Sequence, residues 1–207
     1  MGKIIALVNQ KGGVGKTTSS INLAASLGVY KKKTLLVDLD PQGNSTTGVG
    51  ISKTDYEKSV YELLKDDAEL EEVIIKTKFN NLYVIPATIN LAGLDFELME
   101  KSKLDPTFVR GNQLKKHLTK AKEVFDYIII DCPPSLGILT TNALTAADSV
   151  IIPVQCEFFA LEGIMQLLNT IMLAQKNLNP NLNIEGVLLT MLDVRTNLGL
   201  EVVEDIK

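Results

Sequence analysis

The stretch NQKGGVGKTT, Asn9 to Thr18, constrains the fold of this chain more than any other. The short apolar run Ile4 to Val8 precedes it, as in a buried strand, and a helical pattern begins at Lys16. In a Gly-rich loop between a strand and a helix, backbone N–H groups and the helix N-terminus form a concave surface that binds phosphates. Glycine lets the main chain approach closely because it lacks a Cβ, and the loop contains Gly12, Gly13 and Gly15. The sequence therefore predicts a nucleotide site.

The loop contains two lysines and departs from the standard phosphate-loop pattern. That pattern, G-x-x-x-x-G-K-[ST], has a glycine five positions before Gly15, where this chain has Gln10. Lys16 is predicted to reach the terminal phosphates and Thr17 to offer its hydroxyl to Mg²⁺. Spacing alone assigns no role to Lys11, since a single loop lysine is usually a solvated charge.

Apolar runs alternate with helical patterns along the chain. Several runs are apolar at consecutive positions, which is typical of strands buried on both faces of a mostly parallel sheet. The predicted strands are Lys3–Val8, Thr34–Leu39, Leu82–Ile85, Tyr127–Ile130, Ser149–Val154 and Ile184–Thr190. The predicted helices are Lys16–Tyr30, Val60–Leu64, Leu91–Lys101, Thr107–Lys122, Thr140–Ala147 and Ala160–Asn177, and Gly43 to Asp55 is expected to be a mobile loop. This alternation predicts an α/β, doubly wound fold with helices on both faces of the sheet.

Acidic residues follow two of the predicted strands. Asp38 and Asp40 lie in VDLDPQGN, and Asp131 ends YIIID. The carboxyl ends of parallel strands face the crevice in which open α/β sheets bind ligands. We expect Asp131 to hold Mg²⁺ through water, and Asp40, also a candidate metal ligand, to orient the attacking water.

Composition limits the number of domains, the cellular location and the kinds of partner that we expect. The chain has 207 residues, 45% of them apolar, which suits a single domain with a full core. No secretory signal and no apolar run long enough for a bilayer is found, so we expect a cytoplasmic protein without a membrane partner. Cys132 and Cys156 lack metal-ligand spacing and are expected to be buried, reduced thiols. With a net charge of −4, any contact with nucleic acid needs a local basic patch or a dimer that concentrates one.

The motifs KGGVGKTT, VDLDPQGN and IIIDCPPSLG together resemble those of the ParA/Soj-type deviant Walker A ATPases, which segregate bacterial chromosomes and plasmids. The resemblance continues through IPATINLAGLDFEL, TNALTAADSVIIPVQCEFFALEG and IEGVLLTMLDVRTN. It spans nearly all of the chain and implies a P-loop ATPase fold, with ATP and Mg²⁺ as cofactors.

The resemblance also implies a role for the second lysine. In this family two ATP-bound subunits close face to face, and the first loop lysine reaches the partner's phosphates. Lys11 matches that lysine and Lys16 the ordinary one, so Lys11, Lys16 and Asp40 are the expected catalytic residues. The expected nucleotide contacts are Lys11, Gly12, Gly13, Val14, Gly15, Lys16, Thr17 and Thr18, and the expected metal site is Thr17, Asp131 and Asp40.

The family's partners are implied in the same way. An ATP-dependent homodimer binds DNA without sequence preference and so associates with the nucleoid, and a ParB-type protein stimulates hydrolysis. Arg195 matches a position that the family uses for DNA. Lys31 to Lys33 and the cluster Lys115, Lys116, His117, Lys120 and Lys122 are further candidates, although charge runs are usually solvated faces, and His117 is expected to be a surface residue.

The carboxyl end of the chain departs from the family pattern. Leu198 to Lys207 is predicted to be a helix with no strand after it, whereas family members continue with another strand, a helix and a basic segment. We therefore expect residues 1–207 to be one P-loop domain that lacks its last strand and helix.

Two other function classes remain open at this point. One is a relative of MinD, which binds membranes through a carboxyl-terminal amphipathic helix. The other is a metabolic enzyme with the same loop, such as a dethiobiotin-synthetase-like ligase or an iron-sulfur reductase that needs two cysteines per subunit. The sequence DPQGNSTTG favours the ParA branch over the MinD-type relative. Against the reductase, Cys156 lies in a stretch that matches the ParA pattern instead.

Overall fold

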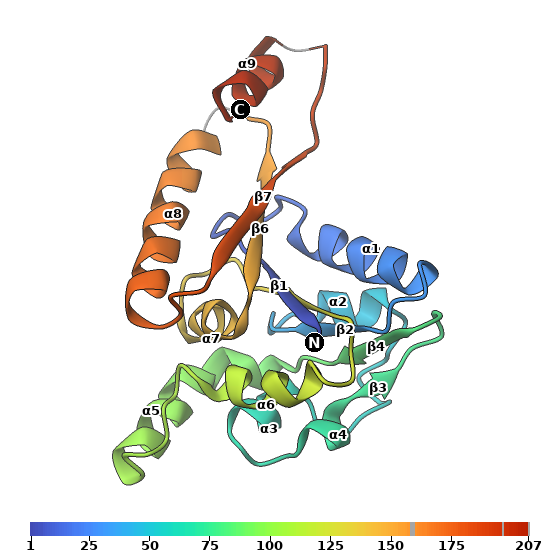
Figure 1. The fold of residues 1–207 in the computed structure, drawn as a ribbon, viewed down its shortest axis with the longest axis vertical. Helices are drawn as coiled ribbons and strands as arrows, with labels where there is room; N and C mark the ends of the chain where they lie inside the picture. The colour runs from blue at the N-terminus through green and yellow to red at the C-terminus, as the bar shows by residue number, and fades with distance from the viewer. Residues whose placement is uncertain (158–159, 196, 207) are drawn as a thin grey trace.

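A computed structural model describes residues 1–157, 160–195 and 197–206, and a seven-stranded sheet forms its centre (Figure 1). The strand order is β3-β4-β2-β5-β1-β6-β7, and all neighbours are parallel except the β3–β4 pair. This confirms the predicted doubly wound, mostly parallel α/β fold. The strands are β1 (Lys3–Leu7), β2 (Thr34–Asp38), β3 (Ile75–Lys76), β4 (Leu82–Ile85), β5 (Tyr127–Asp131), β6 (Ser149–Gln155) and β7 (Asn183–Thr190).

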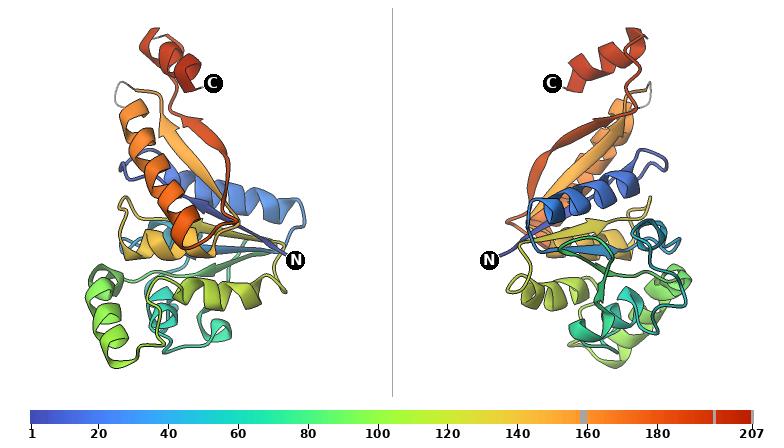
Figure 2. Two further views of the ribbon diagram at one scale, coloured as in Figure 1. Left: turned by 60° about the vertical axis from the view of Figure 1, so that its left-hand side comes forward. Right: turned by 90° about the vertical axis from the view of Figure 1, so that its right-hand side faces the viewer.

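Helices cover both faces of the sheet (Figures 1 and 2). One face is covered by α1 (Lys16–Val29) and α2 (Asn44–Gly48). The helices of the other layer are α3 (Val60–Leu64), α4 (Leu70–Val73), α5 (Leu94–Leu104), α6 (Gln113–Ala121), α7 (Ile138–Ala146) and α8 (Ala160–Asn177), while α9 (Asn197–Ile206) lies near the far ends of β6 and β7. No helix in the described ranges is long and apolar enough to cross a membrane.

The strands contribute side chains to two separate cores. In β1, Ile4 and Ala6 pack into the larger core, whereas Ile5 and Leu7 pack into the core beneath α1. Side chains alternate between the faces of a strand, so a sheet covered on both sides needs apolar residues at successive positions. This accounts for the consecutive apolar runs in the sequence.

Two predicted helices differ from the structure by more than two residues at one end or both. The predicted helix Leu91–Lys101 is a 3₁₀ turn, Ile89–Gly93, followed by α5, which continues to Leu104. The predicted helix Thr107–Lys122 starts only at Gln113. The carboxylate of Asp105 accepts hydrogen bonds from the backbone N–H and hydroxyl of Thr107, and this local turn competes with a helix.

The expected mobile loop, Gly43 to Asp55, is partly helical and packed. It contains α2, and Ser45, Thr46 and Val49 are buried. The prediction was wrong because the hydroxyls of this segment bond to buried carboxylates, so its polar composition does not indicate exposure.

Candidate nucleotide site

A cavity of about 400 Å³ lies at the carboxyl ends of the strands, where the loop after β1 meets the first turn of α1. Its walls are Gly12, Gly13, Gly15, Lys16, Thr17, Thr18, Asp40, Gln42, Asn44, Pro134 and Met191. Two other hollows, of about 590 and 610 Å³, are larger but contain no part of the loop. Six of the eight predicted loop residues and Asp40 therefore line one cavity, to which Pro134 and Met191 contribute from two further segments.

The loop has the backbone conformation that its glycines permit. Gly13 and Gly15 have φ angles of 78° and 86°, in the left-handed region that favours glycine. Gly15 is the N-cap of α1, so the unpaired N–H groups of the first helical turn open toward the cavity. This arrangement favours an anion such as phosphate.

Val14 takes part through its backbone only. Its side chain is buried in the protein, and its carbonyl oxygen accepts a hydrogen bond of 2.9 Å from the hydroxyl of Thr190, at the end of β7. A Cβ on Gly15 would lie 3.5 Å from the methyl group of the same threonine. The end of β7 thus supports the loop from behind, a contact that has no signal in the sequence.

Lys16 lies inside the loop. Its side chain is largely buried, with 6% of the residue exposed, and Nζ donates a hydrogen bond of 2.9 Å to the carbonyl oxygen of Lys11. Burial lowers the pKa of Lys16, and the nearby Asp131 carboxylate acts in the opposite direction. A terminal phosphate would replace the loop carbonyl as the partner of this ammonium group.

Lys11 has a different position, outside the cavity walls. Its ammonium group forms an ion pair with Glu157, just after β6 in the same chain. Asn9 holds the start of the loop against β6, since its side-chain amide donates to the carbonyl of Pro153 (2.7 Å) and its oxygen accepts from the N–H of Lys11 (3.0 Å). In this structure Lys11 is therefore paired within its own chain and is not a solvated charge.

Asp131 is fully buried behind the first turn of α1. Its oxygens accept hydrogen bonds from Ser20 (3.1 Å), Ser45 (2.5 Å) and the hydroxyl of Thr17. Burial raises the pKa of Asp131, and these hydrogen bonds act against the rise. The carboxylate is thus well placed to orient hydroxyls but does not line the cavity.

The oxygen atoms at the cavity fit Mg²⁺. Thr17 and Asp40 line the wall beside the loop, and Mg²⁺ prefers oxygen ligands, keeping several waters and sharing phosphate oxygens. Thr17 and Asp40 are the protein groups that would hold the ion, and Asp131 would act from behind Thr17 or through water. When bound, the ion would neutralise charge on the phosphates.

Asp38 is the buried neighbour of Asp131 across the β2–β5 pair. One oxygen accepts from the backbone N–H and hydroxyl of Thr46, each at 2.8 Å, and the other accepts from the N–H of Asp40 at 3.1 Å. Burial raises the pKa of Asp38 to about 7, against the effect of the Thr46 hydrogen bonds. Asp38 therefore anchors both flanks of the segment that carries Asp40, a function that the sequence motif alone did not indicate.

The predicted DNA contact Arg195 lies away from the cavity, in the segment after β7. Its guanidinium donates to both carboxylate oxygens of Asp193, at 2.8 and 2.7 Å, and its side chain is exposed. The structure therefore does not bring Arg195 together with the nucleotide site.

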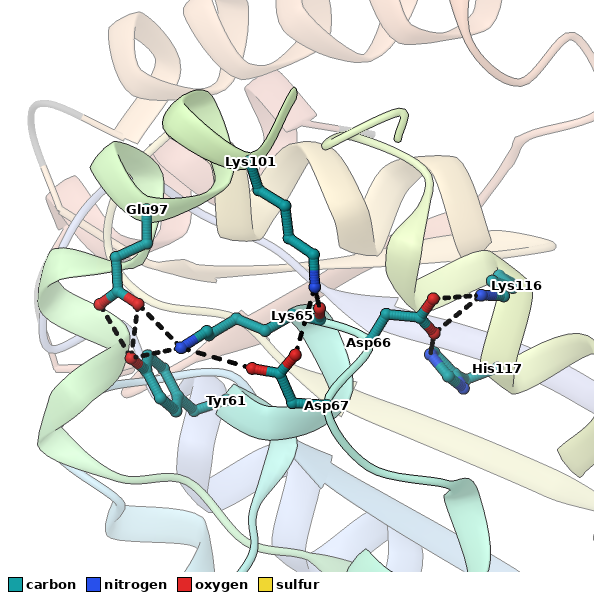
Figure 3. A network of polar contacts seen from close by, with 8 residues as sticks. All are labelled: Tyr61, Lys65, Asp66, Asp67, Glu97, Lys101, Lys116 and His117. Carbon is teal, nitrogen blue, oxygen red and sulfur yellow. Dashed lines mark hydrogen bonds and ion pairs between the residues drawn. The ribbon is translucent and has the colours of Figure 1, made fainter. Parts of the chain in front are cut away.

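Three lysines of the second basic cluster that the sequence suggested are paired with acids, and Figure 3 shows the pair of Lys116 with Asp66. Lys116 pairs with Asp66, Lys120 with Glu69 and Lys122 with Asp148. His117 is 3% exposed, so the expectation of a surface histidine was wrong. It lies on the inner side of α6, its Nε2 lies 3.3 Å from an oxygen of Asp66, and burial lowers its pKa.

Both cysteines are free thiols. Cys132 is buried as expected, and burial raises the pKa of its thiol, whereas Cys156 is half-buried.

Comparisons with known proteins agree on one family. The model of a family described as an AAA domain matches residues 2–184. The sporulation initiation inhibitor protein Soj of Bacillus subtilis is 61% identical over 100% of this chain and 79% of its own length.

Two solved structures extend the comparison. A Mycobacterium smegmatis protein named cobyrinic acid a,c-diamide synthase was solved with a bound ATP analogue and magnesium. It is 41% identical with a TM-score of 0.91, and the match covers 100% of this chain and 82% of the M. smegmatis chain. A putative plasmid partition protein of Borrelia burgdorferi, bound to AMPPNP, is 32% identical with a TM-score of 0.79. The match covers 100% of this chain and 81% of the Borrelia chain. The phosphate loop with its two lysines, the parallel sheet and these similarities together show that the chain belongs to the ParA/Soj-type P-loop ATPases, which are ATP hydrolases.

Proposed function

We propose that this ATP hydrolase, which uses ATP and Mg²⁺, is a DNA-partitioning switch. ATP closes two copies face to face over their nucleotide cavities, and the closed pair binds DNA without sequence preference. Hydrolysis then opens the pair and releases the DNA, and a ParB-type partner accelerates this step.

The different positions of the two loop lysines carry the proposal. Lys16 lines the cavity of its own chain, whereas Lys11 lies outside the walls and is held by Glu157 at the rim. In a closed pair, Lys11 would exchange Glu157 for the phosphates of the other copy and would neutralise charge as an arginine finger does. ATP would thereby become part of the interface between the copies.

Asp40 is the residue assigned to turnover. It lines the cavity next to Thr17, and its segment is anchored through Asp38. There it would orient the attacking water toward the terminal phosphate. Residues 1–207 act in this proposal as one P-loop domain.

Paired variants at these two positions test the proposal. Lys11→Ala should leave ATP binding largely intact but abolish ATP-dependent dimerisation, whereas Asp40→Ala should preserve ATP-dependent dimers and stop hydrolysis. Light scattering measures the first property and phosphate release the second. Dimerisation of the Lys11 variant at the wild-type ATP concentration, or normal turnover by the Asp40 variant, would refute the corresponding assignment.

The alternatives give different results. Co-sedimentation with liposomes would indicate a MinD-like protein. A metabolic enzyme would consume a small substrate together with ATP, and the M. smegmatis relative bears such a name. The cluster-binding version predicts coloured protein after anaerobic purification, and colourless protein would refute it.

A further inference from the structure

Lys11 is held at two points that differ in burial. Its backbone N–H donates to the side-chain oxygen of Asn9, which is only 6% exposed and whose amide donates to Pro153 in β6. Its ammonium group pairs instead with Glu157, and these two side chains are 39% and 34% exposed. Buried hydrogen bonds are strengthened by the low dielectric of the interior, whereas partly exposed ion pairs are weak. The main chain of Lys11 is therefore fixed, and its side chain is the part that can move.

The position of Glu157 is fixed by the strands that also support the phosphate loop. Its backbone N–H donates to the carbonyl of Gln155, at the end of β6, at 2.8 Å. The N–H of Cys156 donates to the carbonyl of Thr190 in β7 at 3.2 Å, and the hydroxyl of the same threonine donates to the carbonyl of Val14 at 2.9 Å. Thr190 thus contacts both the loop and the segment that carries Glu157, so the tertiary structure holds the two together.

Gln10, which replaces a glycine of the standard phosphate-loop pattern, contacts the same part of the protein. Its side-chain amide donates to the side-chain oxygen of Gln166 on α8 at 2.7 Å. A glycine has no side chain for such a contact. Residues 9–11 are therefore held by β6, α8 and Glu157, whereas most of residues 12–18 line the nucleotide cavity.

The ion pair of Lys11 with Glu157 competes with the role that the proposed function gives to Lys11. The ammonium group cannot reach the phosphates of another copy while it remains on the carboxylate of its own chain. Closure of two copies therefore breaks two such pairs, one in each chain. A triphosphate carries more negative charge than one carboxylate and attracts the ammonium group more strongly. The pair thus opposes closure, and it is weak enough for bound ATP to overcome.

We propose that Glu157 restrains Lys11 within its own chain and so weakens the closure of two nucleotide-bound copies. The inference rests on the proposed function and extends it to a positioning residue outside the cavity walls. One exposed ion pair changes an equilibrium by about 1.4-fold to fivefold. Because closure breaks two separate pairs, the factors multiply, and removing the restraint should tighten the closed pair roughly twofold to thirtyfold.

The test compares two variants that each remove one carboxylate from an exposed ion pair. Glu157→Gln releases Lys11, and Asp95→Asn removes the partner of Arg110. Asp95 lines a hollow together with Pro41, so the control lies at the same end of the sheet as the nucleotide cavity. Light scattering gives the dissociation constant of the dimer with AMPPNP and Mg²⁺, at about 0.1 M and about 1 M salt. The melting temperature checks that each variant is folded.

We expect Glu157→Gln to form the dimer at least about twofold more tightly than the wild type at the lower salt concentration, and Glu157→Ala to do the same. Salt screens a partly exposed ion pair, so this advantage should shrink at the higher salt concentration. A change in packing that does not involve charge would persist there. Asp95→Asn should stay within about twofold of the wild type.

The possible failures are distinguishable. Less than twofold tightening by Glu157→Gln would make the pair an incidental surface contact and would overturn the inference. Equal tightening by Asp95→Asn, or tightening that persists at high salt, would also overturn it, because net charge or packing would then explain the effect. Absence of any nucleotide-dependent dimer of the wild-type chain would instead refute the proposed function itself.

Discussion

At the scale of single residues, burial controls the charges that this protein can use. Asp131 and Asp38 are buried with hydroxyl and N–H donors around them, and Lys16 is buried beside a loop carbonyl. Removing a charge from water costs free energy unless hydrogen bonds replace the hydration, so these donors are part of the site. The same principle applies to His117, which Figure 3 shows beside Asp66.

His117 predicts a pH dependence of stability. Its pKa in the folded chain lies below the usual 6.5, chiefly through burial, so the unfolded chain takes up a proton first as the pH falls. The stability associated with neutral His117 is lost as the pH falls below about 6.5 toward the folded pKa. Asp38 acts in the opposite sense: its raised pKa means that its contribution falls as the pH rises toward about 7.

The comparison of wild type with His117→Gln isolates the histidine from the buried carboxylates. Between about pH 7.5 and 5.5, the melting temperature of His117→Gln should fall less than that of the wild type. Lys115→Gln, on the same helix, should follow the wild type. An equal fall in melting temperature over this pH range for wild type and His117→Gln would contradict the prediction.

At the scale of elements, hydrophobic periodicity predicted the long helices and the central strands well. The bounds of α3, α8 and β4 agree with the predicted ones. Periodicity failed where short polar segments form hydrogen bonds with distant groups. In α2, for example, the backbone N–H and the hydroxyl of Thr46 donate to the carboxylate of Asp38. Periodicity reports which face of an element is buried, and it does not report hydrogen bonds to another element.

Replacing glycine by alanine should change the stability of the protein in opposite directions at two helical positions. A Cβ on Gly28, in α1, would meet the Asn80 carbonyl at 2.3 Å, whereas a Cβ on Gly163, in α8, would meet nothing within 4 Å. Gly28→Ala should destabilise by about 1–3 kcal/mol through the steric clash. Gly163→Ala should stabilise by about 0.5–1 kcal/mol, because alanine loses less backbone entropy in a helix. Urea unfolding measures both, and the same sign for both variants would refute the steric argument.

At the scale of the whole molecule, the parallel sheet places the charged groups at its two ends. The phosphate loop, Asp40 and Asp131 lie at the carboxyl ends of the strands, where open α/β sheets bind their ligands. A hollow lined by Lys31, Lys76 and Lys78 lies at the opposite ends of the strands. The nucleotide cavity and this hollow thus occupy opposite ends of the sheet.

Binding of nucleotide at the cavity predicts a shift in the stability of the whole chain. A ligand at about one hundred times its dissociation constant stabilises the folded state by about 2.7 kcal/mol, so ATP with Mg²⁺ should raise the melting temperature by several degrees. Lys16→Ala should abolish most of this shift because its ammonium group lies at the cavity. Lys176→Ala, on the distant α8, is the control, and an undiminished shift in Lys16→Ala would exclude the cavity as the phosphate site.

The fold class and the place of the phosphate loop could be predicted because both depend on local patterns: consecutive apolar residues in strands, and glycines before Lys16 and Thr17. The pairing of charges could not be predicted in this way. Glu157 forms an ion pair with Lys11, and Asp66 forms one with Lys116. Lys31, Lys76 and Lys78, which line one hollow, have no acidic partner in the described part of the chain. The physical reason is that ion pairs and burial depend on distances between segments far apart in the chain, which no local pattern encodes.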